Sequence, residues 1–388
     1  MTGNKQLQSW LALHLVPGMG PVTCNKLVAY FGGPDKVFSA SLSALRTVCR
    51  LRQESLAALS EEGRQNLLGL AREEIGRAAD KNITIIAFDD PLYPSLLKNI
   101  HDPPPVLYVL GNPGILNCKG IGMVGSRAAT HYGRSIAHKM ASSLARQGFT
   151  IISGMALGID TAAHNGAIAA EGRTIAVLGC GLDIIYPPGN HRLYKDIGSS
   201  GAVVSEYPIG TLPDNFRFPA RNRIISGLSL GVVVVEAANR SGSLITASHA
   251  LEQGREVFAV PGRIDSVKSA GTHNLLQQGA KLVHSIDDIV EEFSTISPDY
   301  HQTNPTRVNS EQENTAQLNQ QEFTLLACLD VYPQTIDELV RESGFTPQKT
   351  NELLLLLELK GFVESLPGKS FQKSSTLTVS KDELVPKI

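Results

Sequence analysis

The residues best suited to bind a ligand lie in one short segment of the chain, where three arginines and two phenylalanines occur within eight positions. A guanidinium group donates paired hydrogen bonds to a phosphate, and a phenyl ring stacks on a nucleic-acid base. Arg221 and Arg223 fall at the predicted start of a helix, where the helix dipole disfavours cations and a compensating anion is expected. The alternative is surface charge beside core aromatics. The candidate ligand contacts in this segment are Asn215, Arg217, Phe218, Arg221, Asn222 and Arg223.

Two further loops combine glycine with serine and arginine. Gly125-Ser126-Arg127 follows a predicted buried strand, and Asn239-Arg240-Ser241-Gly242-Ser243 opens a predicted helix. Glycine permits a ligand to approach the backbone closely, and a helix N-terminus presents unpaired N–H groups to an anion. Gly125, Ser126, Arg127, Gly242 and Ser243 are therefore predicted to contact phosphate. Taken alone, the Gly-Ser-Arg triplet is more typical of a structural turn.

Asp160 and His164 lie one helical turn apart after a loop of small residues, 153–160. Residues at this spacing share one face of a helix. The pair is either a catalytic dyad or a capping carboxylate near a hydrogen-bonded histidine. We favour the second interpretation.

The hydrophobic pattern between residues 83 and 285 predicts the elements that position these loops. Short β-branched runs alternate with amphipathic stretches of ten to sixteen residues, such as 132–147 and 243–253. Strand, glycine loop, helix and strand is the order of a doubly wound α/β domain, an extended Rossmann-like parallel sheet that binds ligands at the strand ends. The predicted strands are 84–87, 106–110, 120–124, 150–153, 174–178, 202–205, 231–236, 256–260 and 281–284.

The flanks differ in character from this core. Residues 1–80 are predicted to be all-α, and Pro17-Gly18-Met19-Gly20 between two helices resembles a helix-hairpin-helix, although an ordinary helical hairpin fits equally well. The Rossmann-like domain spans 81–294, and the polar segment 295–317 is predicted to be a flexible linker. Three short helices and a hairpin over 318–373 follow the order of a winged helix. Residues 374–388 are predicted to form a disordered tail.

Composition limits the classes of protein that remain. The chain of 388 residues carries 35 basic and 37 acidic side chains, so a nucleic acid must be held by a local pocket and not by a global positive field. The five cysteines are scattered without metal-ligand spacing, which indicates reduced thiols and no zinc site. Apolar runs are too short for a membrane span, and no signal sequence is evident. We expect a cytoplasmic protein with no metal, no cofactor and no membrane association.

Several of these segments together resemble the DNA-processing protein A (DprA/Smf) family. The resemblance covers about 105 to 285. It rests on Gly125-Ser126-Arg127, the loop 153–160, residues 176–179 with Gly181-Leu182-Asp183, residues 221–229, residues 235–237 with 241–244, and Val260-Pro261-Gly262. It implies a protein without enzymatic activity that binds incoming single-stranded DNA in natural transformation, or competence, protects it and helps load the RecA recombinase.

The resemblance also implies partners and site residues. Homodimers would form through the Rossmann-like domain, and single-strand-binding protein is a candidate partner. Ser126 and Arg127 would line a pocket for the DNA backbone, with Phe218, Arg221, Asn222, Arg223, Gly242 and Ser243 at or near it. Family members often carry a basic residue shortly before the Phe-Pro segment, whereas this chain has Asp214-Asn215 there with Arg217 nearby. The second cationic contact therefore stays open.

The charge of the winged-helix segment argues against strong duplex binding. Residues 318–373 carry five basic and eight acidic side chains, and the predicted recognition helix, 346–359, has five consecutive leucines and one lysine. Because phosphate contacts dominate affinity for DNA, we favour a protein-contact or regulatory role for this domain.

Other classes of function remain as alternatives. A nucleotide phosphoribohydrolase of the lysine-decarboxylase-like Rossmann group would use a carboxylate such as Glu236, yet Ser241-Gly242-Ser243-Leu244 departs from the Pro-Gly-Gly-x-Gly-Thr pattern of that group. A nicotinamide dehydrogenase is disfavoured because the first strand–helix loop lacks GxGxxG. A protein scaffold would bind no DNA at all.

Overall fold

The computed structural model describes residues 2–296, 318–330, 333–366 and 368–373. The chain divides into two compact units, Met1–Ile296 and Ser297–Ile388, each of which is described by itself. Nearly all of the predicted linker and the whole predicted tail lie outside the described residues.

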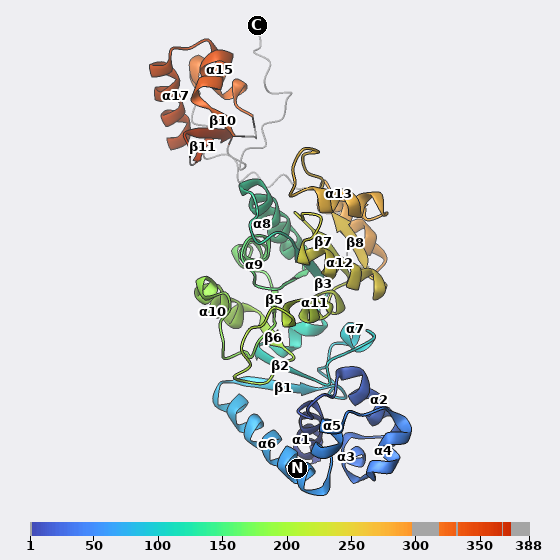
Figure 1. Ribbon diagram of the computed structural model, residues 1–388. Coiled ribbons are helices and arrows are strands. Elements are labelled where there is room, and N and C mark those ends of the chain that lie inside the picture. Colours follow the sequence, from blue (N-terminus) through green and yellow to red (C-terminus); the bar gives the residue numbers. More distant parts are fainter. Residues whose placement is uncertain (1, 297–317, 331–332, 367, 374–388) are drawn as a thin grey trace. The chain divides into compact units, whose positions relative to one another are not determined.

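Residues 2–80 form six helices, which are coloured blue in Figure 1. They are α1 (Thr2–His14), α2 (Pro21–Phe31), α3 (Pro34–Ser39), α4 (Leu42–Val48), α5 (Gln53–Ala58) and α6 (Glu61–Asp80). Ser41 and Ser60 cap α4 and α6 by accepting backbone N–H groups, and Gly32 ends α2 in the left-handed region with φ 78°. These helices share a hydrophobic core with the sheet, because Trp10 and Leu11 belong to one buried cluster with Tyr108 of the second strand. The domain boundary predicted at residue 80 stays a prediction.

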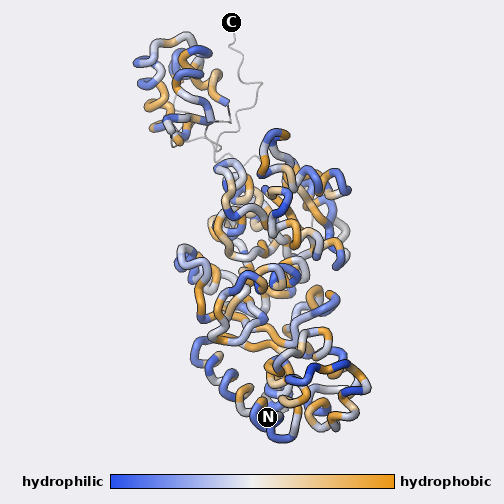
Figure 2. Tube along the Cα trace, viewed as in Figure 1, coloured by the Kyte–Doolittle hydropathy of each residue, from blue (hydrophilic) through white to orange (hydrophobic). Residues whose placement is uncertain are grey.

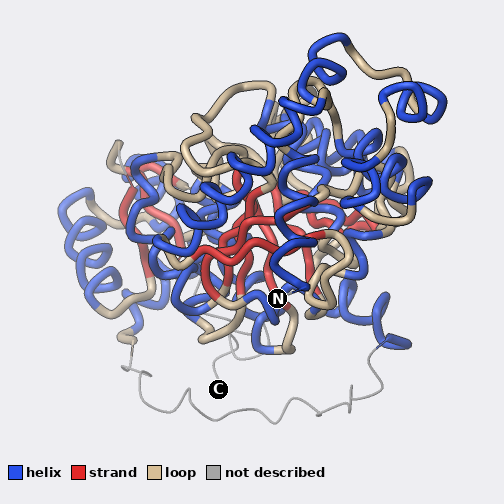
Figure 3. The backbone as a smooth tube through the Cα atoms, turned by 90° about the horizontal axis from the view of Figure 1, so that it is seen from below, coloured by secondary structure: helices blue, strands red, loops and turns tan. Residues whose placement is uncertain are grey.

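A nine-stranded sheet forms the centre of the first unit (Figure 3). The strands follow the order β1-β2-β6-β5-β4-β3-β7-β8-β9. Their bounds are β1 (Ile83–Ala87), β2 (Val106–Gly111), β3 (Gly120–Val124), β4 (Thr150–Ser153), β5 (Thr174–Leu178), β6 (Ala202–Ser205), β7 (Gly231–Val234), β8 (Glu256–Ala259) and β9 (Lys281–Leu282). Each predicted strand is present.

The sheet is mixed, which corrects the expectation of a parallel sheet at one edge. The seven neighbouring strands β6-β5-β4-β3-β7-β8-β9 pair in the parallel sense. In contrast, β1 pairs with β2, and β2 with β6, in the antiparallel sense. The sequence pattern gave no sign of this because strand direction depends on long-range pairing and not on local periodicity. The α/β class and the mostly parallel core are confirmed.

Helices cover both faces of the parallel part. On one face lie α8 (His131–Arg146) and α9 (Ile159–Ala169), and on the other lie α11 (Arg217–Gly227) and α12 (Gly242–Glu252). Successive residues of β7 point to opposite faces, so Val232 packs with α11 and α12 while Val233 packs with α8. Apolar side chains thus cover both faces of the strands, and Figure 2 colours much of the sheet as hydrophobic.

Shorter elements complete the first unit. They are α7 (Ser95–Lys98), α10 (His191–Ser200), α13 (Ala270–Gln277), α14 (Asp287–Val290) and the 3₁₀ turns η1 (Pro113–Asn117), η2 (Pro188–Asn190) and η3 (Glu291–Ile296). No helix in the described parts of the chain is long and apolar enough to cross a membrane.

The strand order changes direction between β3 and β7. The chain runs from β3 outward through β4, β5 and β6 on one side, and returns to β7, β8 and β9 on the other. The loops that follow β3 and β7 therefore diverge and open a crevice at the carboxyl ends of these two strands.

The second unit has the winged-helix architecture. Its elements are α15 (Gln320–Cys328), β10 (Gln334–Thr335), α16 (Ile336–Ser343), α17 (Pro347–Leu359), β11 (Val363–Leu366) and β12 (Ser370–Lys373), with strand order β10-β12-β11. Capping boxes begin α15 and α16, and Leu325, Leu339 and Leu353 are buried in its core. The predicted winged helix is confirmed.

Candidate nucleic-acid interface

A cavity of about 580 Å³ opens at the crevice between β3 and β7. The loops after these strands and the first turns of α11 and α12 enclose it. Most of the residues predicted to bind DNA line this one cavity, although they come from three separate parts of the chain: Gly125, Ser126, Arg127, Asn215, Phe218, Arg221, Asn222, Gly242 and Ser243. Arg217 and Arg223 are outside its lining.

Backbone contacts fix the loop that carries Ser126 and Arg127. The Ser126 N–H donates to the Glu236 carbonyl at 2.8 Å, and the Ser126 carbonyl accepts from the Ile159 N–H at 3.2 Å. A Cβ at Gly125 would stand 2.9 Å from the Glu236 carbonyl oxygen and 2.6 Å from the Ile159 side chain, so glycine is required there. The loop is thereby held while the Arg127 side chain remains exposed.

Arg127 and Arg240 present guanidinium groups to the cavity from the loops after β3 and β7. The Arg127 guanidinium lies over the Phe218 ring, 5.4 Å from its centroid. Both arginines are exposed, and within the described part of the chain neither has a hydrogen-bonded or ionic partner. Arg240 was absent from the predicted contacts. The sequence signal that could identify Arg240 as a contact is its position in the loop between a strand and the N-terminus of a helix.

Arg221 forms a fixed cation inside the same cavity. It is 5 % exposed, and its guanidinium donates to the Gly154 carbonyl at 2.9 Å. Burial lowers the pKa of Arg221 to about 10, against the opposing effect of Asp160, so the side chain stays protonated at neutral pH. A Cβ at Gly154 would stand 2.5 Å from this guanidinium, which explains the glycine.

The N-terminus of α12 forms another wall of the cavity. Ser241 caps the helix, and its hydroxyl lies 2.7 Å from the Ser243 hydroxyl. The Asn222 amide donates to the Gly242 carbonyl at 3.2 Å, which joins α11 to this loop. The positive end of a helix dipole thus faces the cavity together with the arginines.

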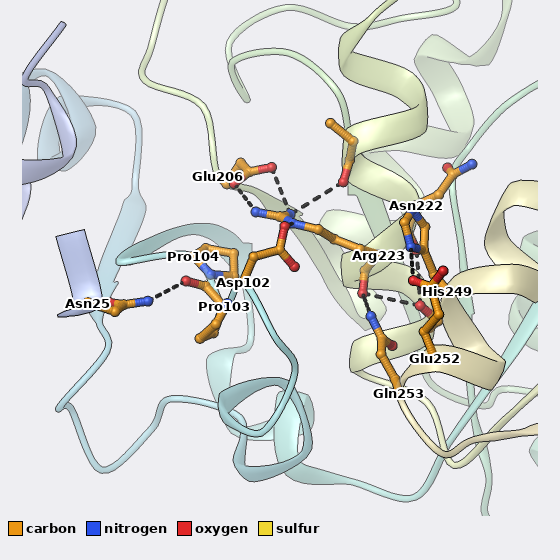
Figure 4. A network of polar contacts seen from close by, with 12 residues as sticks. Asn25, Asp102, Pro103, Pro104, Glu206, Asn222, Arg223, His249, Glu252 and Gln253 are labelled. Atoms are coloured by element: carbon orange, nitrogen blue, oxygen red, sulfur yellow. Dashed lines mark hydrogen bonds and ion pairs between the residues drawn. The ribbon is translucent and has the colours of Figure 1, made fainter. Parts of the chain in front are cut away.

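Arg223 lies elsewhere, and its predicted role as a DNA contact is not supported. It donates to both carboxylate oxygens of Glu206, at 2.9 and 2.7 Å, and to Asp102 at 2.7 Å (Figure 4). Burial tends to lower the pKa of Arg223, but Glu206 and Asp102 outweigh it and raise that pKa. The anion expected near the start of this helix is therefore supplied by the protein, and a DNA phosphate would have to displace two carboxylates.

Arg217 is also engaged within the protein. Its guanidinium contacts two aromatic rings, 5.4 Å from the Tyr207 centroid and 5.1 Å from the Phe216 centroid, and it donates to the Leu212 carbonyl. It precedes Phe218 in the chain but is absent from the lining of the cavity.

A second, smaller cavity of about 150 Å³ adjoins the first at Phe218. Phe218 stacks on Tyr186 with ring centroids 5.4 Å apart and an interplanar angle of 23°. The two cavities share Arg127, Ala156, Phe218 and Arg221. An aromatic pair therefore borders the cationic cavity, which joins phosphate-binding and base-stacking chemistry in one place.

Asp160 and His164 do not bond to each other. The Asp160 carboxylate accepts from the backbone N–H groups of Gly154 at 3.1 Å and Ala156 at 3.3 Å, while burial raises its pKa. His164 is fully buried, shares a hydrogen bond with Thr174 at 2.7 Å and has a pKa lowered to about 3 by burial. The predicted helix cap is wrong, because Asp160 binds N–H groups of the loop before α9 and the N-cap residue Gly158 has no side-chain cap; the hydrogen-bonded histidine is confirmed.

Glu236, the carboxylate that a phosphoribohydrolase would require, is committed to the start of α8. It accepts from the backbone N–H of Thr130 at 2.9 Å and from the Thr130 hydroxyl. It is 6 % exposed and outside the lining of the larger cavity. No cluster of three or more potential metal-binding side chains occurs among the described residues.

The hairpin between α1 and α2 has a carboxylate against it. Gly18 has φ +70°, and a Cβ there would meet a Glu54 carboxylate oxygen at 2.1 Å. Ser55 donates to the Pro17 carbonyl at 2.7 Å. An anion already occupies this side of the hairpin, which favours the ordinary helical hairpin over a phosphate site.

Comparison with known proteins identifies the family. The family profile described as DNA recombination-mediator protein A matches residues 84–294, and that of the DprA winged helix domain matches residues 309–369. Protein Smf of Synechocystis is 35 % identical across 95 % of this chain and 99 % of its own length. DNA processing protein DprA of Bacillus subtilis is 43 % identical across 67 % of this chain and 87 % of its own length.

Solved structures agree with these matches. The X-ray structure of DprA from Streptococcus pneumoniae is similar with a TM-score of 0.65 and 37 % identity, covering 74 % of this chain and 97 % of that one. A structure reported for the single-stranded DNA binding mode of DNA processing protein A from Helicobacter pylori has a TM-score of 0.51 and 32 % identity, covering 56 % and 97 %. On these grounds, and on the position of its arginine-lined cavity, the chain belongs to the DNA processing protein A (DprA/Smf) family.

Proposed function

We propose that the cavity between β3 and β7 binds the backbone of single-stranded DNA. The observation that carries the proposal is the exposed Arg127 guanidinium over Phe218, at the mouth of a cavity whose other cations are Arg221 and Arg240. Each of these groups recognises phosphate without reading sequence, and the stacked Phe218–Tyr186 pair adds aromatic surface beside them. Binding to single strands of any sequence follows from this combination.

The arrangement of the three arginines suggests how successive phosphates are held. Arg221 is buried and fixed by the Gly154 carbonyl, so it supplies a permanent charge that needs no reorganisation. Arg127 and Arg240 reach the cavity from opposite sides of the switch point and can each hold a phosphate oxygen. Asn215 lines the cavity where family members often have a basic residue, and Arg240 offers the additional cation.

The wider role follows from the family. We propose that this protein binds incoming single-stranded DNA in natural transformation in the cytoplasm, helps load the RecA recombinase and dimerises through the Rossmann-like domain. The H. pylori relative is described by its single-stranded DNA binding mode, which supports the first part. In this proposal the protein acts by binding, without a catalytic step; Glu236 holds the start of α8, and Asp160 holds the loop before α9.

The central test is the Arg127→Ala substitution. Loss of a charge-assisted contact should weaken binding of oligo-dT by about 1–3 kcal/mol, and the slope of log affinity against log salt should fall by about 0.7. Fluorescence anisotropy with labelled dT over a range of salt concentrations measures both quantities.

Arg146→Ala is the matched control. Arg146 is an exposed arginine in the last turn of α8. This helix connects β3 to the parallel strand β4, so its last turn lies at the amino ends of the strands, away from the cavity. The Arg146→Ala substitution removes the same charge away from the cavity and should leave affinity nearly unchanged. An Arg127→Ala protein with the affinity of the Arg146→Ala protein would refute the pocket assignment.

A further inference from the structure

Phe216 is an exposed aromatic residue in the segment that joins two residues of the cavity wall. Its side chain is 66 % exposed, although large aromatic residues normally gain stability from burial. Asn215 before it and Phe218 after it both line the cavity. Phe216 is therefore continuous with the proposed site without forming part of its wall.

The Phe216 ring is contacted by the guanidinium group of Arg217. The Arg217 guanidinium lies 5.1 Å from the Phe216 centroid and 5.4 Å from the Tyr207 centroid. Arg217 is restrained in turn, because its side chain donates to the Leu212 carbonyl and its N–H donates to the Asp214 carbonyl at 3.0 Å. The Arg217 guanidinium is thus restrained, and it lies beside the exposed Phe216 ring.

We propose that Phe216 is a stacking platform for a base of the DNA strand as the strand leaves the cavity. The proposal rests on the proposed function and extends the site beyond the cavity, toward the loop 212–217. An aromatic face stacks on any base, and the adjacent guanidinium adds favourable electrostatics for the phosphate that follows. Arg217 acts here as a positioning residue, which gives it a role even though it is absent from the cavity lining.

Phe216→Ala with two matched ligands tests this assignment. Binding of dT12 should weaken about fivefold or more, as expected for one lost base stack, while binding of an abasic 12-mer with the same backbone should be unchanged. Tyr30→Ala is the control, since Tyr30 is 68 % exposed and lies at the C-terminal end of α2, away from the residues that line the cavity. That control should bind both ligands as the parent does.

Phe216→Trp gives a direct reading of the stack. The only other tryptophan, Trp10, is 1 % exposed and provides a constant background. Adding dT12 should quench the new fluorescence strongly, and the abasic 12-mer should not. The inference is overturned if Phe216→Ala leaves dT12 affinity unchanged, if it weakens both ligands equally, or if Phe216→Trp is not quenched. If one of these results occurs and Arg127→Ala still weakens dT12 binding, only the role of Phe216 is refuted and the proposed function is retained. If Arg127→Ala binds dT12 as the parent does, the proposed function itself is refuted.

Discussion

A substitution at Arg223 distinguishes two roles of this residue. The sequence predicts that Arg223 contacts DNA, whereas in the structure Arg223 belongs to a buried ion-pair network. We predict that Arg223→Met destabilises the fold and leaves the intrinsic affinity of the folded protein for single-stranded DNA unchanged. The reason lies in its partners. Its side chain is 7 % exposed, that of Glu206 is 8 % exposed and that of Asp102 is 36 % exposed.

The magnitude follows from what the substitution leaves behind. Removing one partner of a buried ion pair typically costs about 3–5 kcal/mol, because the remaining charge is buried without compensation. Asp102 is partly hydrated and can turn to solvent, so Glu206 carries most of the cost. We therefore expect a loss of about 3 kcal/mol, a large share of the roughly 5–15 kcal/mol by which folded domains are stable, and a fall in Tm of roughly 5 °C.

Urea denaturation monitored by circular dichroism measures the change in the free energy of unfolding. Fluorescence anisotropy with labelled dT12 measures affinity, without urea and at a low temperature at which the variant remains folded. A second variant, Glu206→Gln with Arg223→Met, removes the isolated carboxylate charge and should recover part of the lost stability. The reasoning is refuted if Arg223→Met keeps the parent stability and loses DNA affinity, since that result would make Arg223 a DNA contact.

Two further predictions concern pH and the second unit. His164 has a folded-state pKa lowered to about 3, below the value near 6.5 of an unfolded chain, so its contribution to stability is complete above pH 6.5 and is lost as pH falls toward 3. The free energy of unfolding should therefore drop between pH 7 and pH 4.5 by up to roughly 2–3 kcal/mol more in the parent than in a folded His164→Asn protein, and equal pH profiles would contradict this. Deleting residues 318–388 should leave oligo-dT affinity within about twofold, because α17 exposes Leu355 and Leu359 instead of cations; a much larger loss in the same anisotropy assay would assign DNA binding to the winged helix.

The exposed leucines of α17 bear on the role of the second unit. Leu355 is 58 % exposed and Leu359 is 77 % exposed, one turn apart on the helix that would enter a DNA groove in a duplex-binding winged helix. An apolar surface there is poorly suited to a phosphate backbone. A protein-contact or regulatory role for this domain remains our prediction.

The positions of the elements could be predicted because they depend on local patterns. Runs such as 231–234 are apolar at every position, as expected for strands covered on both faces, and glycine or proline marks the ends of many of the helices. Strand direction at the β1–β2 edge could not be predicted, since an antiparallel and a parallel strand have similar composition when both are buried.

The sequence by itself determined the class of the fold, the loops that carry arginine, glycine and serine, and the family to which they belong. Only the tertiary structure decided which arginines line the cavity. Arg221 and Arg223 are two residues apart on one helix, which turns their side chains toward different surroundings: Arg221 toward the cavity and Arg223 toward Asp102 and Glu206. Those carboxylates come from distant parts of the chain, and Arg240 reaches the cavity only because β7 pairs with β3. Whether an arginine is free or paired depends on such long-range neighbours, which local sequence does not encode.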